Sequence, residues 1–485
     1  MQIFLILGIP VLLALGAFCL GKRRSFSVIN CAGYLAVLCC AISLFKEAVF
    51  AGSAKSFFGF IYLDLLSAFF ILVISVVAFA CALYSIGYIR KDISLGIISE
   101  QKGKIYYLLF NLFCFSMFFV PAVDNLGMLW VAIEMTTLIS AFLVGFYNSK
   151  ESVEAAWKYI IICSVGIIFA LLGTILFSYA FSISGLSRSL NWSAIAPVAH
   201  ILDKNILKVA FIFILGGYGT KAGLAPMHTW LPDAHSQAVA PISALLSGVL
   251  LKTAVYAILR FGIIIIKSAG FAYFAHLLLL FGVVSLVISS GFILVQKDLK
   301  RLLAYSSIEH IGIIAIGFGL GSPLAIAGAL LHIFNHAVTK SLMFFGAGNI
   351  VRAYKKHNLR AIRGVIKALP FTGIMALLGV FALTGFPPFS IFISEIMIII
   401  ASFVNGSYLI AALLLIFLAV IFSAFIYHFG KMLFGNLPKG IVTQGEPLSG
   451  KLAFLFLLSL ICALGLALPF ILKDLLWTAQ KLLQG

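Results

Sequence analysis

The sequence predicts an all-α integral membrane protein with about fourteen transmembrane helices. Hydrophobic residues make up 63% of its 485 residues and charged residues 10%, whereas a soluble globular chain has about 45–50% and about 25%. Apolar runs of about 20 residues, the length that crosses a bilayer, follow one another along almost the whole chain. Short runs of strictly alternating residues are missing from the sequence, which argues against a membrane β-barrel.

The apolar runs place the spans in order along the chain. We expect helices near residues 3–20, 26–50, 57–88, 105–122, 125–147, 155–182, 207–230, 239–266, 270–295, 301–319, 322–351, 366–403, 407–434 and 450–476. The seventh span is interrupted at Pro226. The twelfth is too long for one straight helix and contains Gly385, Pro387 and Pro388, so we expect two half-helices there.

The two interruptions predict an internal repeat. They lie five spans apart, and each accompanies an ionisable residue, Lys221 and Glu395. Because five is an odd number, equivalent helices run in opposite directions. This is the pattern of two inverted five-helix repeats, spans 4–8 and 9–13, with binding positions at the broken helices. The chain then divides into N-terminal helices (1–104), a first half-channel (105–266), a second half-channel (270–434) and a C-terminal helix (450–485).

The positions of the positive charges indicate how the spans are oriented. The net charge is +18, and most lysines and arginines fall in loops that follow odd-numbered spans. Positive residues concentrate in cytoplasmic loops. We therefore expect both termini of this multi-pass protein to lie on the non-cytoplasmic side. Since topology accounts for the charge, we expect no nucleic-acid partner.

The cysteines give no sign of a bound cofactor. None of the eight forms a CxxC pair, and all lie within or beside apolar runs. No spacing typical of iron–sulfur, haem or zinc sites occurs. We expect this chain to bind neither a cofactor nor a metal.

Ionisable residues inside the spans are the main functional signal. A charged side chain at the bilayer centre costs about 2.5–3.5 kcal/mol on insertion scales, so such residues mark ion or proton pathways by default. The clearest candidate is Lys221, beside the break at Pro226. The full set is Glu134 in the fifth span, Lys221 in the seventh, Lys252 in the eighth, Glu309 and His310 in the tenth, His332, His336 and Lys340 in the eleventh, Glu395 in the twelfth and His428 in the thirteenth.

Three of these side chains share one helical face. His332, His336 and Lys340 recur every four residues, which places them about one turn apart. A file of water along that face could carry a proton between neighbours, and histidine exchanges protons near neutral pH. In the first half, Glu134 could keep Lys221 charged when the two are close and let it discharge when they separate, which makes a two-state element.

Structural roles are the alternative for these residues. A single lysine can extend to the membrane surface, and a polar face can hold helices together. Asp64 could cap a helix or pair locally, Arg260 fits an anchor near a helix end, and His228 and His235 fit loop positions. A purely structural account leaves unexplained why so many ionisable groups fall in broken or polar-faced helices.

Five motifs carry a resemblance to a known family. They are GTKAGLAPMHTWLPDAHSQA (219–238), LLKTAVYAILRF (250–261), KDLKRLLAYSSIEHIGIIAIG (297–317), LLHIFNHAVTKSLMFFGAGNI (330–350) and LTGFPPFSIFISE (383–395). They resemble the antiporter-like proton-channel subunits, a superfamily that includes membrane-arm subunits of respiratory complex I, Mrp-type sodium/proton antiporters and energy-converting hydrogenases. The similarity covers roughly spans 3–13. Within it, IEH (308–310), HIFNH (332–336) and APISALLSGVLLK (240–252) resemble component F of hydrogenase-4 and its formate hydrogenlyase relatives.

The resemblance implies a fold of fourteen helices with two inverted repeats, and it implies roles for most of the set. Glu134 and Lys221 would be the paired carboxylate and lysine of the first half-channel, and Lys252 the connecting lysine. His310 and His336 would form the central relay, and Glu395 would exchange the proton at the far end. Glu309 and Lys340 are features of the subgroup, and His332 and His428 are further candidates.

These expectations combine into one leading hypothesis, a proton-translocating membrane subunit of a multi-subunit, redox-driven complex. The resemblance implies that it lies in the cytoplasmic (inner) membrane of a prokaryote. Its partners would be other membrane subunits and a soluble redox arm of the nickel–iron hydrogenase or complex I type. The alternatives are a cation/proton antiporter subunit of Mrp type, a membrane anchor that transports nothing, and a partner in inorganic-carbon uptake. Dependence of transport on Na⁺ would favour the first, and proton flux unaffected by substitution of these residues would favour the second.

Overall fold

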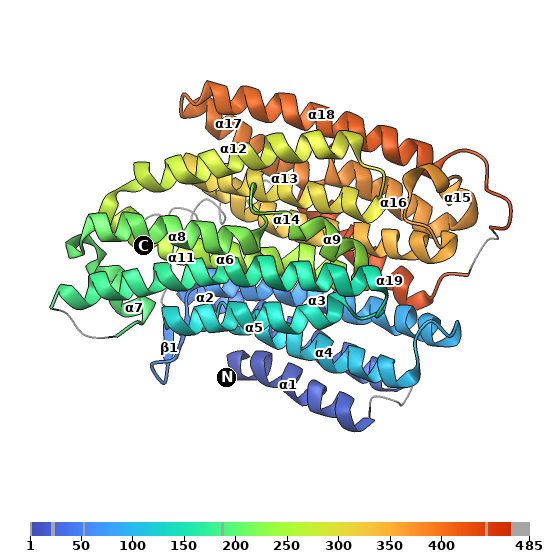
Figure 1. Cartoon of the computed structure of the whole chain (residues 1–485), viewed down its shortest axis with the longest axis horizontal. Helices are drawn as coiled ribbons and strands as arrows, with labels where there is room; N and C mark the ends of the chain where they lie inside the picture. The colour runs from blue at the N-terminus through green and yellow to red at the C-terminus, as the bar shows by residue number, and fades with distance from the viewer. Residues whose placement is uncertain (1, 21–24, 52–53, 186–188, 442–444, 467–485) are drawn as a thin grey trace.

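The protein forms a bundle of long helices that lie roughly parallel to the long axis of the molecule (Figure 1). The computed structural model describes residues 2–20, 25–51, 54–185, 189–441 and 445–466. Helix α1 (Gln2–Leu20) lies at one edge of the bundle in Figure 1, and α18 (Tyr408–Leu433) lies at the opposite edge. The predicted all-α fold class is confirmed.

The helices follow one another in the order that the apolar runs predict. The first part of the chain contains α2 (Phe26–Ala51), α3 (Leu65–Ser94), α4 (Glu100–Phe119), α5 (Leu126–Val144), α6 (Lys150–Ile183), α7 (Trp192–Ile195), α8 (Lys204–Ala222) and α9 (Trp230–Gln237). The second part contains α10 (Ala240–Leu245), α11 (Leu251–Ala269), α12 (Phe271–Val295), α13 (Leu299–Leu320), α14 (Pro323–Tyr354), α15 (Val365–Ala368), α16 (Pro370–Leu383), α17 (Ser390–Val404) and α19 (Leu448–Leu466). A π-helical turn (Leu246–Leu250) joins α10 to α11, and 3₁₀ turns lie at Ala196–Ile201 and Leu359–Ala361.

Ten helices within the described residues are long and apolar enough to cross a membrane. They are α1, α2, α3, α5, α6, the continuous stretch from α10 to α11, α12, α13, α18 and α19. Helices α4, α8 and α14 and the half-helices α16 and α17 pack in the same bundle without meeting that criterion. The total of fourteen spans therefore stays a prediction, whereas a multi-pass membrane protein is confirmed.

Both expected helix breaks are present. Residues 223–229, which include Pro226, separate α8 from α9. Residues 384–389, which include Pro387 and Pro388, separate α16 from α17. A proline has no amide hydrogen to donate, so each break leaves backbone groups without intrahelical partners deep in the bundle.

The two breaks share a local sequence and a backbone shape. Each reads Gly-x-x-Pro, starting at Gly223 in the first half and at Gly385 in the second. Both glycines adopt left-handed backbone angles, with φ +82° and φ +65°, a region that residues with a Cβ enter only at a cost. This correspondence agrees with the predicted internal repeat.

Two predicted boundaries clearly differ from the structure, and a third cannot be compared with it. The seventh span does not end near residue 230, because α9 continues to Gln237 beyond the break. The third span starts later than residue 57, because two short antiparallel strands precede it, β1 (Lys55–Phe57) and β2 (Ile61–Leu63). Asp64 then caps α3 by accepting a hydrogen bond from the Ser67 amide at 2.9 Å. The last ten residues of the fourteenth predicted span lie outside the described residues.

Helix α3 is buried along most of its length and is held at each end by an arginine–aspartate pair. At its start, the Arg260 guanidinium of α11 binds both carboxylate oxygens of Asp64 at 2.6 Å. Near its end, Arg352 of α14 lies 2.8 Å from Asp92. The predicted cap at Asp64 is therefore confirmed, whereas its charged partner lies on another helix and is not local in sequence. Arg260 is 3% exposed and sits inside the protein, so the expectation of a membrane-surface anchor was wrong.

The charged state of Asp64 follows from its surroundings. Burial opposes ionisation of this carboxyl, but the Arg260 guanidinium and the Ser67 amide together hold its pKa below the ordinary value. The Arg260 guanidinium also lies 4.4 Å from the centre of the Trp192 ring. The pair is therefore ionised at neutral pH and joins α3 to α11 as a fixed unit.

Glycines allow helices of the bundle to pack closely. A Cβ on Gly217 of α8 would come within 2.5 Å of the Ala170 backbone nitrogen on α6. Gly282 of α12 and Gly312 of α13 face each other, and a Cβ on either would come 2.8 Å from the carbonyl oxygen of the other. Close approach of this kind is how helices associate in lipid, where the hydrophobic effect does not drive them together. It brings the end of α8, with Lys221, against the polar side chains of α6.

Substitution of Asp64 tests the first of these pairs. Asp64→Asn keeps an acceptor for the Ser67 amide but leaves Arg260 buried without its counter-charge. Breaking a buried ion pair by removing one partner costs about 3–5 kcal/mol, so we expect the free energy of unfolding to fall by about that amount. The matched control is Glu154→Gln, which removes the exposed pair with Lys158 and should change stability by about 0–1 kcal/mol. Denaturant unfolding of the purified protein in detergent measures both, and equal effects would contradict the assignment.

Candidate functional site

Lys221 lies in the last turn of α8, immediately before the first break, and its side chain is fully buried. Its ammonium donates hydrogen bonds to the hydroxyl of Thr137 at 2.8 Å and to that of Tyr159 at 2.6 Å. Ser140 shares a further hydrogen bond of 2.7 Å with the Tyr159 hydroxyl. Helices α5 and α6 therefore supply a short chain of hydroxyl groups around the lysine, which can pass a proton to or from it.

Glu134 reaches Lys221 through Thr137. The Thr137 hydroxyl donates to one carboxylate oxygen of Glu134 at 3.1 Å while it accepts from the lysine. Ser164 of α6 donates to the other oxygen at 3.2 Å. Glu134 is half-buried, in contrast to Lys221. The sequence-predicted pair is thus brought together, but with one hydroxyl group between the carboxylate and the ammonium.

Lys252 joins the two halves of the molecule. Its ammonium lies 2.5 Å from the carbonyl oxygen of Ser247, in the π-helical turn before α11, and 2.5 Å from Nδ1 of His336 on α14. Turns of the π type are frequent at functional sites in helices. Lys252 and His336 are both buried. The predicted connecting lysine therefore contacts the predicted central histidine directly.

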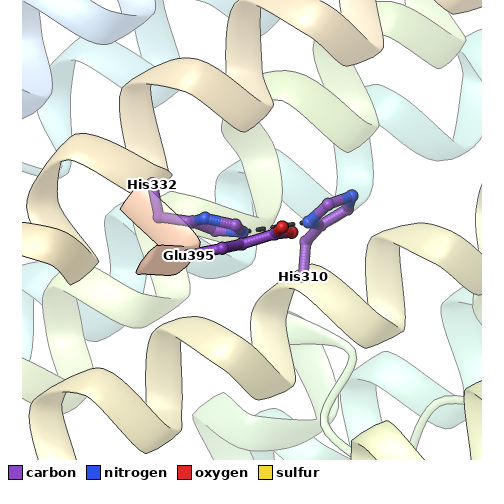
Figure 2. Close-up of side chains that lie close together, drawn as sticks. All are labelled: His310, His332 and Glu395. Carbon is purple, nitrogen blue, oxygen red and sulfur yellow. Dashed lines mark hydrogen bonds between the residues drawn. The ribbon is translucent and has the colours of Figure 1, made fainter. Parts of the chain in front are cut away.

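Three histidines continue from Lys252 into the second half. The ring centres of His336 and His310 are 4.6 Å apart. His310 Nδ1 and His332 Nε2 share a hydrogen bond of 2.9 Å, and His332 Nδ1 lies 2.9 Å from the hydroxyl of Ser394. Figure 2 shows the His310 and His332 rings meeting beside the Glu395 carboxylate. His332, a secondary candidate from the sequence, is therefore central to the cluster.

Glu395 lies on α17, just after the second break, and is 6% exposed. Its carboxylate packs directly against Gly385, at a place where any Cβ would collide with it. The oxygen Oε1 is buried without a hydrogen-bond partner of good geometry among the described residues. The glycine that opens the break therefore also makes room for the carboxylate next to His332.

Of the remaining candidates, Lys340 and Glu309 lie close to each other, whereas His428 lies elsewhere. Lys340 of α14 donates to the carbonyl oxygen of Leu303 at 2.6 Å and to the hydroxyl of Ser306, both on α13. Glu309 is 2% exposed and interacts electrostatically with Lys340. His428 lies apart from this cluster, because its Nε2 approaches the carbonyl oxygens at the end of α12 at 3.2–3.3 Å.

His235 is one of the residues that the sequence interpretation missed. It was expected in a loop, but it lies in α9 with a fully buried ring, stacked on Phe344 at 5.2 Å. It interacts electrostatically with Lys252, Lys300 and Lys340. Neither ring nitrogen has a hydrogen-bond partner of good geometry among the described residues. The signal that could have located His235 is the helix that resumes after Pro226, because a residue in that helix packs in the core and not in a loop.

The second-half cluster also has the composition of a metal site. Within the described part of the chain, His310, His332 and Glu395 offer ligand atoms that all lie within 4.8 Å of one another. Two imidazoles and a carboxylate suit zinc. Here His310 Nδ1 and His332 Nε2 are occupied by their mutual hydrogen bond, which is the contact a proton relay needs. The geometry fits proton exchange between these groups as well as it fits a metal ion.

Comparison with known proteins identifies the family to which the chain is related. Residues 122–423 match a family model described as NADH:quinone oxidoreductase/Mrp antiporter, TM. Residues 52–96 match a model described as NADH-Ubiquinone oxidoreductase (complex I), chain 5 N-terminus. The chain is 38% identical over 379 residues to the hydrogenase-4 component F homolog of Methylacidiphilum infernorum (isolate V4), which covers 76% of this chain and 80% of the relative.

Solved structures agree with this relationship. A chain of the archaeal membrane-bound sulfane sulfur reductase superimposes with a TM-score of 0.87 at 25% identity, over 100% of this chain and 98% of that one. A chain of the Mrp complex from Dietzia sp. DQ12-45-1b gives 0.86 at 20% identity, over 99% and 97%. The fold defines the class of antiporter-like membrane subunits. Within that class, the chain belongs to the NADH:quinone oxidoreductase/Mrp antiporter family of transmembrane subunits.

The contact between Gly385 and Glu395 can be tested with a matched pair of glycines. Gly385→Ala would push the carboxylate away from His332 and should therefore abolish proton movement. Gly406 has a similar backbone angle, φ +71°, and a Cβ added there would meet nothing within 4 Å. Gly406→Ala thus carries the same backbone strain, about 1–2 kcal/mol, without touching Glu395. Proton uptake by reconstituted vesicles should be lost in the first variant and retained in the second, and equal losses would refute a specific role.

Two neighbouring threonines test the bridge between Glu134 and Lys221. Thr137→Val removes the hydroxyl that joins them, and a hydrogen bond to a charged group contributes about 1.5–3 kcal/mol. We expect proton movement to slow by about 10–100-fold. Thr136→Val is the control, since the Thr136 hydroxyl bonds the carbonyl oxygen of Ile133 within its own helix. Stopped-flow measurement of vesicle acidification compares them, and an unchanged rate in Thr137→Val would exclude the bridge.

Proposed function

We propose that this chain is a proton-translocating membrane subunit of a multi-subunit, redox-driven complex in the inner membrane of a prokaryote. The observation that carries the proposal is the run of contacts from Lys252 through His336, His310 and His332 to Ser394, inside an otherwise apolar bundle. Every member of that run can gain or lose a proton or share one through a hydroxyl. Such groups inside a membrane are costly and mark ion pathways.

In this proposal residues 105–266 form the first half-channel. Glu134 is half-buried and can exchange a proton with the neighbouring subunit or with water. A change of charge in that subunit alters the electrostatic interaction between Glu134 and Lys221, which the Thr137 hydroxyl bridges. Lys221 then releases or recovers a proton through the Tyr159 hydroxyl. The two arrangements of the Glu134–Lys221 pair form the bistable element that coupling requires.

Residues 270–434 form the second half-channel. A proton on Lys252 passes to His336 Nδ1, then to His310 and His332, and leaves through Glu395. His235 and the lysines Lys252, Lys300 and Lys340 are buried close enough together for a charge on one to disfavour a charge on another. A proton that arrives at one of them therefore favours departure of a proton from a neighbour, because like charges at this depth are weakly screened.

The chemistry of the path favours H⁺ over Na⁺. Hard cations are bound by oxygen ligands, whereas the path from Lys252 to His332 is built from an ammonium and imidazole groups. An ammonium repels Na⁺ but exchanges a proton readily. The antiporter alternative of Mrp type therefore requires sodium to take another route.

We infer the partners from the relatives and structural neighbours of the chain, together with cysteines that show no iron–sulfur or haem spacing. We propose that other membrane subunits contact this chain and that a soluble arm on separate chains, of the nickel–iron hydrogenase or complex I type, carries the electron transfer. This chain supplies no cofactor in that scheme. By the distribution of positive loops, both termini lie on the non-cytoplasmic side.

The test is substitution at the two ends of the path. Lys221→Ala and Glu395→Gln should each leave the complex assembled and its electron transfer measurable, but reduce donor-driven proton uptake to background. Lys204→Ala is the control, because Lys204 lies exposed at the start of the same helix as Lys221. A pH-sensitive dye in proteoliposomes reports proton uptake, and ²²Na⁺ in the same vesicles reports sodium.

Three outcomes decide among the functions. Loss of proton uptake in both variants, without sodium movement in the native complex, supports the proposal. Sodium movement that disappears with the same substitutions would favour an antiporter subunit. Normal proton uptake in Lys221→Ala and Glu395→Gln would leave only a membrane anchor.

A further inference from the structure

A cleft of about 660 Å³ opens at the end of the bundle where α3 finishes and α4 and α19 begin. It is remote in sequence from the proposed proton path. Its polar lining includes Arg90 and Lys91 from the last turns of α3 and the hydroxyl-bearing residues Ser27, Ser94 and Ser449. The volume falls in the range of small-molecule sites, roughly 300–1,000 Å³. The cleft is therefore large enough for the headgroup of a lipid and the first part of its chains.

The rest of the lining is apolar. Ile86, Ile89, Ile93, Pro447 and Leu448 supply the hydrophobic walls. Leu448 is 71% exposed, so the wall continues onto the outer surface of the bundle. The lining thus combines cations and hydroxyls with apolar side chains, the two kinds of group that complement a phospholipid.

The place of the cleft in the fold fits the membrane surface. Arg90 is exposed and Lys91 is half-buried at the end of a membrane-spanning helix. The turn that follows carries Leu95 and Ile97, which are 57% and 50% exposed. Exposed apolar side chains next to cations at a helix end are typical of the boundary between headgroups and acyl chains.

We propose that this cleft is a binding site for an anionic phospholipid. The Arg90 guanidinium and the Lys91 ammonium bind the phosphodiester, the serine hydroxyls donate to its oxygens, and the acyl chains follow the wall toward Leu448. Basic pockets between transmembrane helices on the cytoplasmic side bind anionic headgroups, and a guanidinium matches the geometry of a phosphate. Since the cleft joins α3 to α4 and α19, an occupied site would stabilise the end of the buried helix α3.

One acidic residue, Glu100, also lines the cleft. Its carboxylate repels a phosphate and so reduces affinity. Glu100 provides a specific test of the site, because removing its charge should raise the affinity for the lipid, whereas removing Arg90 and Lys91 should lower it. Nonspecific attraction of anionic lipid to the positive charge of the protein would not depend on Arg90, Lys91 and Glu100 in particular.

The experiment uses the purified full chain in a neutral detergent. Its thermal unfolding midpoint is measured with added phosphatidylglycerol, phosphatidylcholine or inorganic phosphate, and bound lipid is counted by native mass spectrometry. The test variant is Arg90→Gln/Lys91→Gln. The matched control is Lys150→Gln/Lys297→Gln, which removes two exposed positive charges that do not line the cleft.

We expect phosphatidylglycerol to raise the midpoint of the native chain and of the control, and phosphatidylcholine and phosphate to have little effect. The test variant should lose most of this shift and at least about tenfold in apparent affinity, whereas Glu100→Gln should bind more tightly. Equal loss in the test and control variants would show nonspecific charge attraction and overturn the site. Retention of the shift in Arg90→Gln/Lys91→Gln would overturn it as well, and a response to inorganic phosphate equal to that of the lipid would make free phosphate the ligand instead.

Discussion

The energetic cost of a charge inside an apolar bundle is the constraint on which the rest of this structure depends. An ionised side chain in such surroundings needs a counter-charge, hydrogen-bond partners or a means of losing its charge. Arg260 and Arg352 meet the requirement with fixed aspartate partners at the two ends of α3. Lys221 and Lys252 meet it with hydroxyls, a carbonyl and an imidazole. The fixed pairs hold the fold, and the second kind of partner allows protons to move.

The helix breaks make this second kind of partnership possible. The break after Lys221 ends α8 beside α6, and the break at Gly385 creates the space that the Glu395 carboxylate fills. Glycine contacts between neighbouring helices then bring the polar side chains of separate helices within hydrogen-bond distance. The contact from Lys252 to His336 joins α11 to α14 and so connects the two halves of the chain. The helix breaks interrupt backbone hydrogen bonding, but they also create the positions that the proton-exchanging side chains occupy.

Much of this could be predicted from the sequence, because hydropathy determines spans and proline determines breaks. The spacing of His332, His336 and Lys340 correctly placed them on one buried face. The bridging role of Thr137 could not be predicted, since it depends on how closely α5 approaches α8. His235 was misplaced because the sequence after Pro226 resembles a loop although it forms α9. His428 was a candidate because it is an ionisable residue inside a predicted span, but its side chain contacts the end of α12, away from the cluster.

The central claim is a polar path from Lys252 of α11 to Glu395 beside the second helix break. A high-resolution electron cryo-microscopy map of the whole complex in a lipid nanodisc tests it most directly. The account predicts direct Lys252–His336 and His310–His332 contacts, with ordered water around His235 where its two ring nitrogens have no protein partner among the described residues. Acyl chains or dry apolar side chains between Lys252 and Glu395 would contradict it.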